Sequence, residues 1–484
     1  MRWCGKSASK SDPVFFTCLK KERKLIMKSL ENKDLLSGNL VLNIIKFTLP
    51  IIFSSILQLL FNAADLVVVG KFDLENGSAA QAAIGSTTAL IGLIVNFFLG
   101  LSIGVNVIVA QMIGAKDTKN LKAAVQTSMM IGTAAGIVIM TLGSIFAKPM
   151  LSLMGTDPAV LPLAADYLEI YFFGTPFAMI YNFGSSVLRA SGETRKPMIF
   201  LTVAGVINVI LNLFTVIVLD MGVRGVAIAT SVSNLISGIL IVISLVKTDT
   251  CVKLVIKGAR FNFNCAKKIL GIGITAGLQS SMFSISNVLI QSSVNSFGAT
   301  VMAGNSIAMS IEGFIYVAMN AFSAAAITFV GQCCGAKNYK LLNRVAVMVP
   351  LLAAATGIVF GWGAYFLRDP LAHIYSSNEA DIEKALIRMT VICLTYFTCG
   401  LMDSFTGLIR GMGYSLAPMA VSVAGVCLLR IVWIYTVFRL DRTLTTLYIS
   451  YPVSWILTFL ALVVCFFCYK RKLTKNNINA ENNA

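Results

Sequence analysis

Charged residues are scarce in this sequence, and their scarcity argues against a soluble protein. Only 13% of its 484 residues are charged, 57% are hydrophobic and the mean hydropathy is +0.80, whereas a soluble chain carries about a quarter charged residues. Runs without any Asp, Glu, Lys or Arg cover residues 80–114, 123–147, 198–219, 225–246, 345–367 and 443–469. Each run exceeds the roughly 20 helical residues that cross a hydrocarbon core. The sequence therefore predicts a polytopic helical membrane protein.

Motifs of metal, nucleotide and hydrolytic chemistry are also missing. The chain has a single histidine, His373, and no phosphate-binding GxxxxGK motif. The 11 cysteines are scattered, mostly in apolar runs where cysteine behaves as a small hydrophobic residue, and the CxxC pair of Cys465 and Cys468 has no second pair. We therefore expect no metal site, no disulfide framework and no cofactor other than a coupling ion. A membrane-embedded enzyme is the disfavoured alternative, and we expect a protein that is not an enzyme.

The net charge of +17 reflects membrane topology rather than binding of nucleic acid. Of the 39 Lys and Arg residues, thirty fall in the two termini and the connections on their side of the predicted spans, eight fall on the other side, and Arg430 lies within a span. Cytoplasmic segments of membrane proteins carry such an excess of positive charge. We expect a multi-pass protein of the cytoplasmic membrane with both termini in the cytoplasm, with the lipid bilayer as a partner and without a nucleic-acid partner.

The first 26 residues are polar and basic and contain no long apolar stretch, which argues against a secretory signal peptide. Met27 opens a more ordinary beginning, so we expect the natural start there. A basic tail that binds anionic lipid is the competing interpretation.

The chain repeats itself at an offset of 221 residues. The identities in this register extend from the first predicted span to the eleventh. They pair Leu57-Gln58 with Leu278-Gln279, Gln111 with Gln332, Gly114-Ala115-Lys116 with Gly335-Ala336-Lys337, Pro149 with Pro370, Arg189 with Arg410, Gly192 with Gly413, and Pro197-Met198 with Pro418-Met419. Chance matches would not keep one register through Gln, Lys, Arg and Pro, so the pattern indicates that a six-helix unit has been duplicated.

Because six helices return the chain to its starting side, both repeats enter the membrane in the same orientation. Parallel repeats form two lobes around a central cleft and suit alternating access. The predicted fold is an all-α polytopic membrane protein with 12 transmembrane helices in two parallel six-helix repeats. The expected divisions are a basic cytoplasmic tail at 1–43, an N-lobe at 44–246, a cytoplasmic linker at 247–268, a C-lobe at 269–469 and a cytoplasmic tail at 470–484.

Several motifs together resemble the multidrug and toxic compound extrusion family. They are, in order along the chain, FTLPIIFSSILQLLFNAADLVVVGKF, AQMIGAK, LRASGETRKPM, GQCCGAK and IRGMGYSLAPM, and the similarity runs from about residue 35 to residue 470. Within the family, the sequence resembles the prokaryotic branch of DNA-damage-inducible protein F. The resemblance implies a twelve-helix antiporter that exports an organic substrate in exchange for H+ or Na+. Flippases for lipid-linked precursors share the fold and are the alternative.

Asp65 is the foremost candidate for the coupling residue. Roughly twenty residues before it carry no charge that could neutralise it, and an ionisable residue within a span marks a functional site by default. Burial favours the uncharged form of a carboxyl group, which suits a residue that takes up and releases a proton. Asn62 and Gln58 lie one and two turns before it on the same helical face. The alternative is an aspartate at a helix end that pairs with Lys71.

Other polar residues of the N-lobe are expected to join Asp65. Asn208 and Asn212 lie four residues apart on one helical face, although they could simply hydrogen-bond between helices. By resemblance, these asparagines and Thr230 match the family's cation-binding cluster, and Pro50 matches the proline at which its first helix bends. Asn212 departs from the family pattern, which often has an acid there. Loss of that carboxylate favours H+ over Na+ as the coupling ion, and Na+ stays open.

The C-lobe supplies candidates for a substrate cleft. Glu312 is the only charge between residues 269 and 336, so it needs a cation, either Arg430 in a structural ion pair or a substrate. The family's acid near Asp403 lies one turn earlier, and its role is therefore not carried over fully. The candidates for the cleft are Glu312, Asp403, Arg430, Gln279 and Tyr181.

The expected function is a monomeric, cation-coupled antiporter that exports small organic compounds, expected to be cationic, by alternating access. A flippase for a lipid-linked precursor would favour a lumen rich in Arg and Lys. Only Arg430 is expected to lie deep, so the antiporter is the preferred interpretation.

Overall fold

The computed structural model describes residues 35–72, 77–256, 258 and 260–482, and this part of the chain contains helices and no strand. The first half comprises α2 (Leu40–Phe72), α3 (Gly77–Gly114), α4 (Thr118–Leu153), α5 (Leu161–Ala190), α6 (Arg195–Leu213), η1 (Phe214–Val218) and α7 (Gly222–Lys247). The second half comprises α8 (Phe263–Asn295), α9 (Ala299–Gly335), α10 (Tyr339–Phe366), α11 (Arg368–Tyr375), α12 (Glu379–Thr395), α13 (Phe397–Gly411), α14 (Leu416–Ser422), η2 (Val423–Leu428), α15 (Leu429–Tyr435), α16 (Val437–Leu440) and α17 (Leu444–Asn482). The expected start at Met27 lies outside the described residues.

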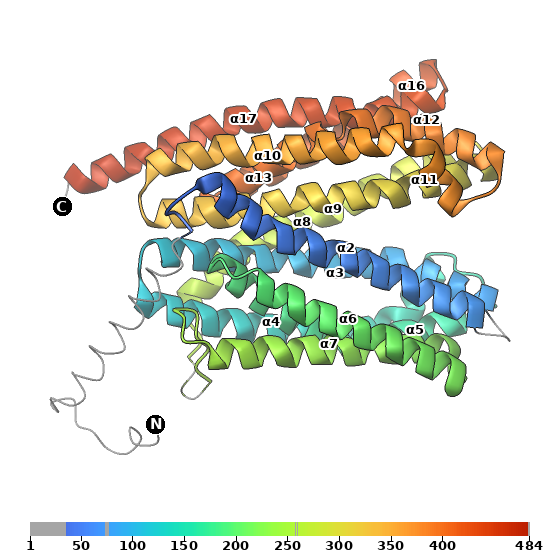
Figure 1. Ribbon diagram of the computed structural model, residues 1–484, viewed down its shortest axis with the longest axis horizontal. Helices are drawn as coiled ribbons and strands as arrows, with labels where there is room; N and C mark the ends of the chain where they lie inside the picture. The colour runs from blue at the N-terminus through green and yellow to red at the C-terminus, as the bar shows by residue number, and fades with distance from the viewer. Residues whose placement is uncertain (1–34, 73–76, 257, 259, 483–484) are drawn as a thin grey trace.

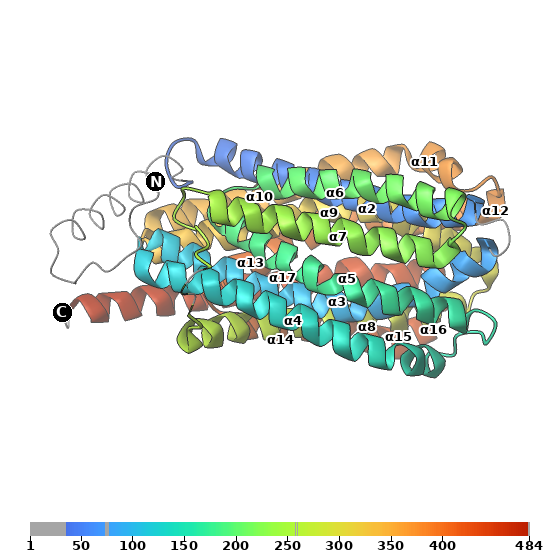
Figure 2. The ribbon, with the colours of Figure 1, turned by 90° about the horizontal axis from the view of Figure 1, so that it is seen from below.

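The helices form two groups that run side by side along one axis (Figures 1 and 2). Ten of the described helices are long and apolar enough to cross a membrane, and α12 with α13, bent by 48°, makes an eleventh span. The helix α5 falls outside this set by hydropathy, but it has 30 residues and packs against α4 and α7, which belong to the set. The predicted all-helical membrane fold is confirmed, whereas the exact domain boundaries stay a prediction.

The equivalent helices α3 and α9 meet at the centre, between the two groups. Ala110 and Gly331 hold equivalent positions in the 221-residue repeat, and a Cβ on Gly331 would lie 2.9 Å from the Cβ of Ala110. Beside them, Thr328 Oγ1 donates a hydrogen bond to Asn106 Oδ1 (3.0 Å). Because equivalent residues face each other only at a symmetry axis, an approximate two-fold axis passes between α3 and α9.

Both GAK turns, residues 114–116 and 335–337, lie at one end of the bundle, which we call the GAK end. Glycine is required here because the backbones of the two lobes approach closely. A Cβ on Gly114 would lie 2.0 Å from the carbonyl oxygen of Gln332, and a Cβ on Gly335 would meet the other lobe in the same way. The close approach brings the lobes into contact at this end.

Two glutamines at equivalent positions join the lobes there. Gln111 donates Nε2 to the carbonyl oxygen of Gly411 (3.0 Å), and Gln332 donates Nε2 to that of Ala190 (2.8 Å). Gly411 and Ala190 are themselves equivalent in the repeat. We call this pair of hydrogen bonds the glutamine latch; it links the lobes twice by the same contact.

The first helix of the chain crosses from one lobe to the other. At the GAK end, Ile44 and Phe47 of α2 belong to the core of the C-lobe, where the rings of Phe47 and Phe329 meet edge-on with centroids 5.6 Å apart. The other half of α2 packs against α6, where Gly205 makes room for the ring of Phe61. One helix therefore contacts both lobes.

The equivalent helix α8 crosses in the opposite direction. Its residues Cys265, Ile269 and Ile272 belong to the core of the N-lobe. Gly277 lies against α3, where a Cβ on it would be 2.4 Å from the carbonyl oxygen of Phe97. Close packing of this kind is typical of small residues at helix interfaces in membranes.

Gly277→Ala should destabilise the protein, because the new methyl group would force α8 and α3 apart. Overpacking of this kind costs about 1–3 kcal/mol, so we expect a lower melting temperature in detergent. Gly271 lies on the same helix and has open space where a Cβ would stand, which makes Gly271→Ala the matched control. Equal melting temperatures of the two variants would contradict the close contact.

Candidate functional site

Asp65 is hydrogen-bonded to a buried pair of asparagines. Asn212 donates Nδ2 to Asp65 Oδ1 and to Asn208 Oδ1 (3.3 Å), and Asn208 donates Nδ2 to Thr230 Oγ1 (3.4 Å). Asn212 is fully buried and Asn208 is only 4% exposed. Residues from α2, α6 and α7 are thus brought together as the sequence suggested. We call Asp65, Asn208, Asn212 and Thr230 the Asp65 cluster.

The local structure of α6 explains how the cluster forms. Asn208 and Asn212 lie one turn apart and share a face, and Gly205, one turn earlier, lets α2 approach by admitting the ring of Phe61. The oxygen Oδ1 of Asn212 is buried and has no hydrogen-bond partner among the described residues. The cluster therefore combines one carboxylate with one unused acceptor beside it.

The other N-lobe candidates lie outside the Asp65 cluster. Gln58 and Asn62 are exposed on α2. Pro50 is buried within α2, which runs as one helix through it, and Ser54 donates Oγ to the carbonyl oxygen of Pro50 (2.9 Å). The expected roles of Gln58 and Asn62 in coupling, and of Pro50 in bending, stay predictions.

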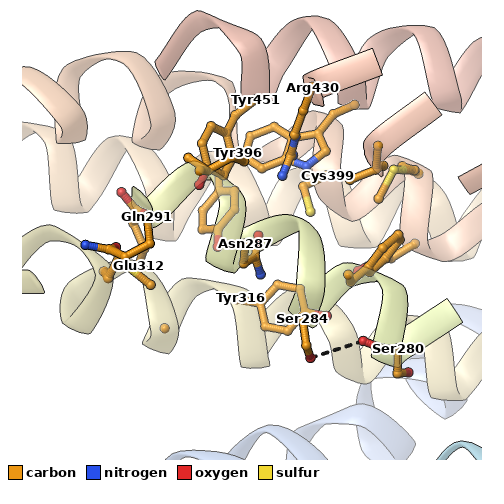
Figure 3. Close-up of a pocket in the computed structure, with 18 of the residues that line it drawn as sticks. Ser280, Ser284, Asn287, Gln291, Glu312, Tyr316, Tyr396, Cys399, Arg430 and Tyr451 are labelled. Carbon is orange, nitrogen blue, oxygen red and sulfur yellow. Dashed lines mark hydrogen bonds between the residues drawn. The ribbon is translucent and has the colours of Figure 1, made fainter. Parts of the chain in front are cut away.

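A cavity of about 450 Å³ lies within the C-lobe, in the half away from the GAK end. Glu312, Asp403 and Arg430 line it, and Asn96 of α3 contributes from the N-lobe. Figure 3 shows Arg430 entering from one side and Ser284 of α8 on the other. The structure thus places three of the five expected cleft residues around one cavity.

Glu312 is paired with Arg388 rather than with Arg430. Arg388 donates Nε to Glu312 Oε1 (2.9 Å) and Nη2 to Glu312 Oε2 (2.6 Å), and its Nη1 reaches Asn305 Oδ1 (2.7 Å). The two charged side chains are only 6% and 4% exposed. Of the two alternatives for Glu312, an ion pair with Arg430 or a cationic substrate, the ion pair with Arg430 is therefore wrong. Counted by position, Arg388 falls with the connection before α12, and its pairing with Glu312 was therefore not predicted.

Arg430 lies against aromatic rings on another wall of the cavity. Its Nε donates to Ser454 Oγ (2.9 Å), and its guanidinium carbon lies 4.1 Å from the ring centroid of Tyr451 and 5.7 Å from that of Trp455. Asp403 is also buried, and its Oδ2 has no hydrogen-bond partner among the described residues. The cavity therefore contains charges of both signs.

Gln279 and Tyr181 do not line this cavity. Gln279 accepts a hydrogen bond from Arg410 Nη2 at Oε1 (2.8 Å). Tyr181 is buried in the N-lobe and donates its hydroxyl to the carbonyl oxygen of Pro197 (2.9 Å). The structure thus corrects their assignment to the substrate cleft, since both are engaged in packing contacts elsewhere.

Metal ligands do not gather in the part of the chain that the structure describes, where no three His, Cys, Asp or Glu residues form a group that could hold an ion. His373 is exposed on α11, where its ring contacts the carbonyl oxygen of Asp369 (2.9 Å) and Glu379 (3.3 Å).

Comparison with known proteins identifies the family. The MatE family model matches residues 50–214 and 275–436, which are corresponding parts of the two repeats and more than half of the chain. The chain belongs to the MatE family. The resemblance seen in the motifs is thereby confirmed, and this MatE protein is a multi-pass membrane transporter. Its place in a particular branch stays a prediction.

Relatives of this MatE transporter match most of its length. The probable multidrug resistance protein YoeA of Bacillus subtilis is 25% identical over 78% of this chain and 82% of its own. The FAD transporter of Shewanella oneidensis is 24% identical over 82% of this chain and 88% of its own. A MOP superfamily transporter structure from Pyrococcus furiosus has a TM-score of 0.85 at 19% identity and covers 91% of this chain and 98% of its own. These likenesses confirm the twelve-helix, two-lobed fold.

Arg388→Met should strongly destabilise the transporter, because it leaves the Glu312 carboxylate buried without its partner. Breaking a buried pair in this way costs about 3–5 kcal/mol. The double variant Glu312→Gln/Arg388→Met removes both charges and should recover part of the loss. Melting temperatures in detergent compare the two, and a double variant no more stable than Arg388→Met would contradict this account.

Proposed function

We propose that this MatE transporter exports small organic compounds, cations among them, across the cytoplasmic membrane in exchange for protons. The observation that carries the proposal is the Asp65 cluster, a single carboxylate held by buried amides within a span. The description of YoeA as a probable multidrug resistance protein supports drug export. The excess of Lys and Arg in the GAK turns and neighbouring connections supports a GAK end that faces the cytoplasm.

The chemistry of the cluster favours a proton over Na+. Sodium is a hard cation and wants several oxygen ligands, as other hard cations do. Here Asp65 accepts a hydrogen bond from Nδ2 of Asn212, and the cluster has one carboxylate. A cation at the cluster would therefore find one carboxylate, whose Oδ1 already accepts a hydrogen bond, and no second acid.

The Asn212 amide suits both protonation states of Asp65. As placed, Nδ2 donates to the charged carboxylate while Oδ1 has no partner among the described residues. Once Asp65 is protonated, it becomes a donor. A half-turn of the Asn212 amide then presents Oδ1 as the acceptor. One side chain can thereby hydrogen-bond both the acid and its conjugate base.

The flippase alternative receives less support. Beyond the expected Arg430, the structure places Arg388 at the cavity, but Glu312 neutralises it. A cavity of about 450 Å³ falls within the range of drug-sized sites, about 300–1,000 Å³. A lipid-linked sugar pyrophosphate would need more positive charge and more room.

Asp65→Asn should abolish proton-driven export, because an amide keeps the hydrogen bond with Asn212 but cannot titrate. Export of ethidium by purified protein in liposomes would be followed under an imposed pH gradient. Asp166→Asn is the control, since Asp166 is a surface acid paired with Arg224 (2.7 Å). Export by Asp65→Asn at the wild-type rate would remove Asp65 from coupling.

Asn212→Asp should create a response to Na+, because it places a second carboxylate beside Asp65. Export under a Na+ gradient at constant pH would be measured for this variant and for the wild type. We expect Na+ to accelerate export by the variant alone. Export by the wild type that follows a Na+ gradient and ignores a pH gradient would refute proton coupling.

A further inference from the structure

Arg430 is a buried cation without an acidic partner. Its side chain is 3% exposed, and none of the ion pairs within the described residues includes it. Its hydrogen bond in this region uses Nε, which donates to Ser454 Oγ (2.9 Å). Arg388, by contrast, uses Nε, Nη1 and Nη2 for Glu312 and Asn305. The two Nη groups of Arg430 are therefore unused donors at the cavity.

The surroundings of Arg430 hold its guanidinium in the cavity. The ring of Tyr451 lies 4.1 Å from the guanidinium carbon, and Arg430 follows shortly after the π-helical segment η2, which ends at Leu428. Segments of this kind occur frequently at functional sites. Figure 3 shows Arg430 extending toward Cys399, beside Tyr396 and Tyr451. The side chain is thus oriented by packing, with its fork of donors toward the interior of the cavity.

A buried charge that lacks a partner is costly, and aromatic ring faces offset only part of the cost. A guanidinium fork matches a carboxylate through two parallel hydrogen bonds. Such an anion would complete the coordination that the protein leaves open at Arg430. The unpaired cation is therefore explained if the molecule in the cavity brings its own acidic group.

The other charges of the cavity indicate what else the molecule carries. Glu312 is neutralised by Arg388, so it is not free to attract a cation. Asp403 lines the cavity and has an oxygen without a hydrogen-bond partner in the described region. Tyr316, Tyr396 and Trp455 add aromatic surface. Arg410 faces the charge of Asp403 within the protein, whereas Arg430 has no such partner among the residues that the structure describes. A flat molecule with a carboxylate would supply that partner, and a basic nitrogen on it could lie toward the open oxygen of Asp403.

We propose that Arg430 binds the carboxylate of the exported molecule, so that the transporter prefers aromatic zwitterions to aromatic cations of the same shape. The inference rests on the proposed function in one respect, that this cavity holds the exported compound. It goes further by naming the substrate class and the residue that selects it.

A fluorescent rhodamine with a free carboxylate and its methyl ester test the proposal, because they differ only in the acidic group. Binding to purified protein in detergent would be read from fluorescence anisotropy. We expect the wild type to bind the acid about tenfold or more tightly than the ester, as a charge-assisted hydrogen bond would provide. Arg430→Gln should abolish this preference by weakening the acid alone, and Arg430→Lys should retain part of it.

Arg439→Gln is the matched control, because it removes an exposed arginine and should leave both affinities unchanged. Equal binding of acid and ester by the wild type, or equal weakening of both in Arg430→Gln, would overturn the proposal and make Arg430 a structural residue. A lipid-linked pyrophosphate that displaces the acid through Arg430 would also overturn the carboxylate assignment. Since binding needs no gradient, a preserved preference without proton-driven export would contradict the proposed function and support the inference.

Discussion

The glutamine latch joins the two lobes at the GAK end, and the proposed antiport by alternating access requires that such an end of the cleft close and open again. Each of its hydrogen bonds joins a side-chain amide to a backbone carbonyl, Gln111 to Gly411 and Gln332 to Ala190. A neutral bond of this kind contributes about 1 kcal/mol net. The latch therefore joins the lobes at the GAK end by neutral hydrogen bonds, and no ion pair between the lobes accompanies it among the described residues. Because its two bonds are equivalent, rotation about the axis breaks them together.

The two candidate sites lack the symmetry that the latch shows. In the 221-residue register, Asp65 corresponds to Ser286, Glu312 to Ile91 and Arg430 to Val209. The carboxylate of Asp65 thus occurs in the N-lobe alone. The Glu312–Arg388 ion pair and Arg430 occur in the C-lobe alone. In the proposed antiport, this division separates the proton from the exported molecule. Neither ligand needs to displace the other from a shared carboxylate, and the two sites communicate through the relative position of the lobes.

The spans and the duplication were accessible from sequence, because hydropathy is local and a repeat needs only a constant offset. The grouping of Asp65 with Asn208, Asn212 and Thr230 was accessible through helical spacing and family resemblance, although their role in coupling stays a prediction. The partner of Glu312 could not be predicted from the sequence. Counting by position places Arg388 with the connection before α12, whereas α12 begins at Glu379 and carries Arg388 more than two turns inward. Packing between helices decides where α12 starts and which of its faces meets α9. Neither can be read from the sequence alone.

The packing of α2 explains how a proton in one lobe can act on the contact between both. Beyond Pro50, α2 carries Asp65 to the amides of α6, while at the GAK end Phe47 lies in the core of the C-lobe. In the proposed antiport, protonation of Asp65 removes the charge that Asn212 stabilises and weakens the attachment of α2 to the N-lobe. Because α2 is continuous from Leu40 to Phe72, a shift at Asp65 is carried along the helix to the C-lobe core near the glutamine latch. Coupling then requires no contact between proton and substrate, only a helix that belongs to both lobes.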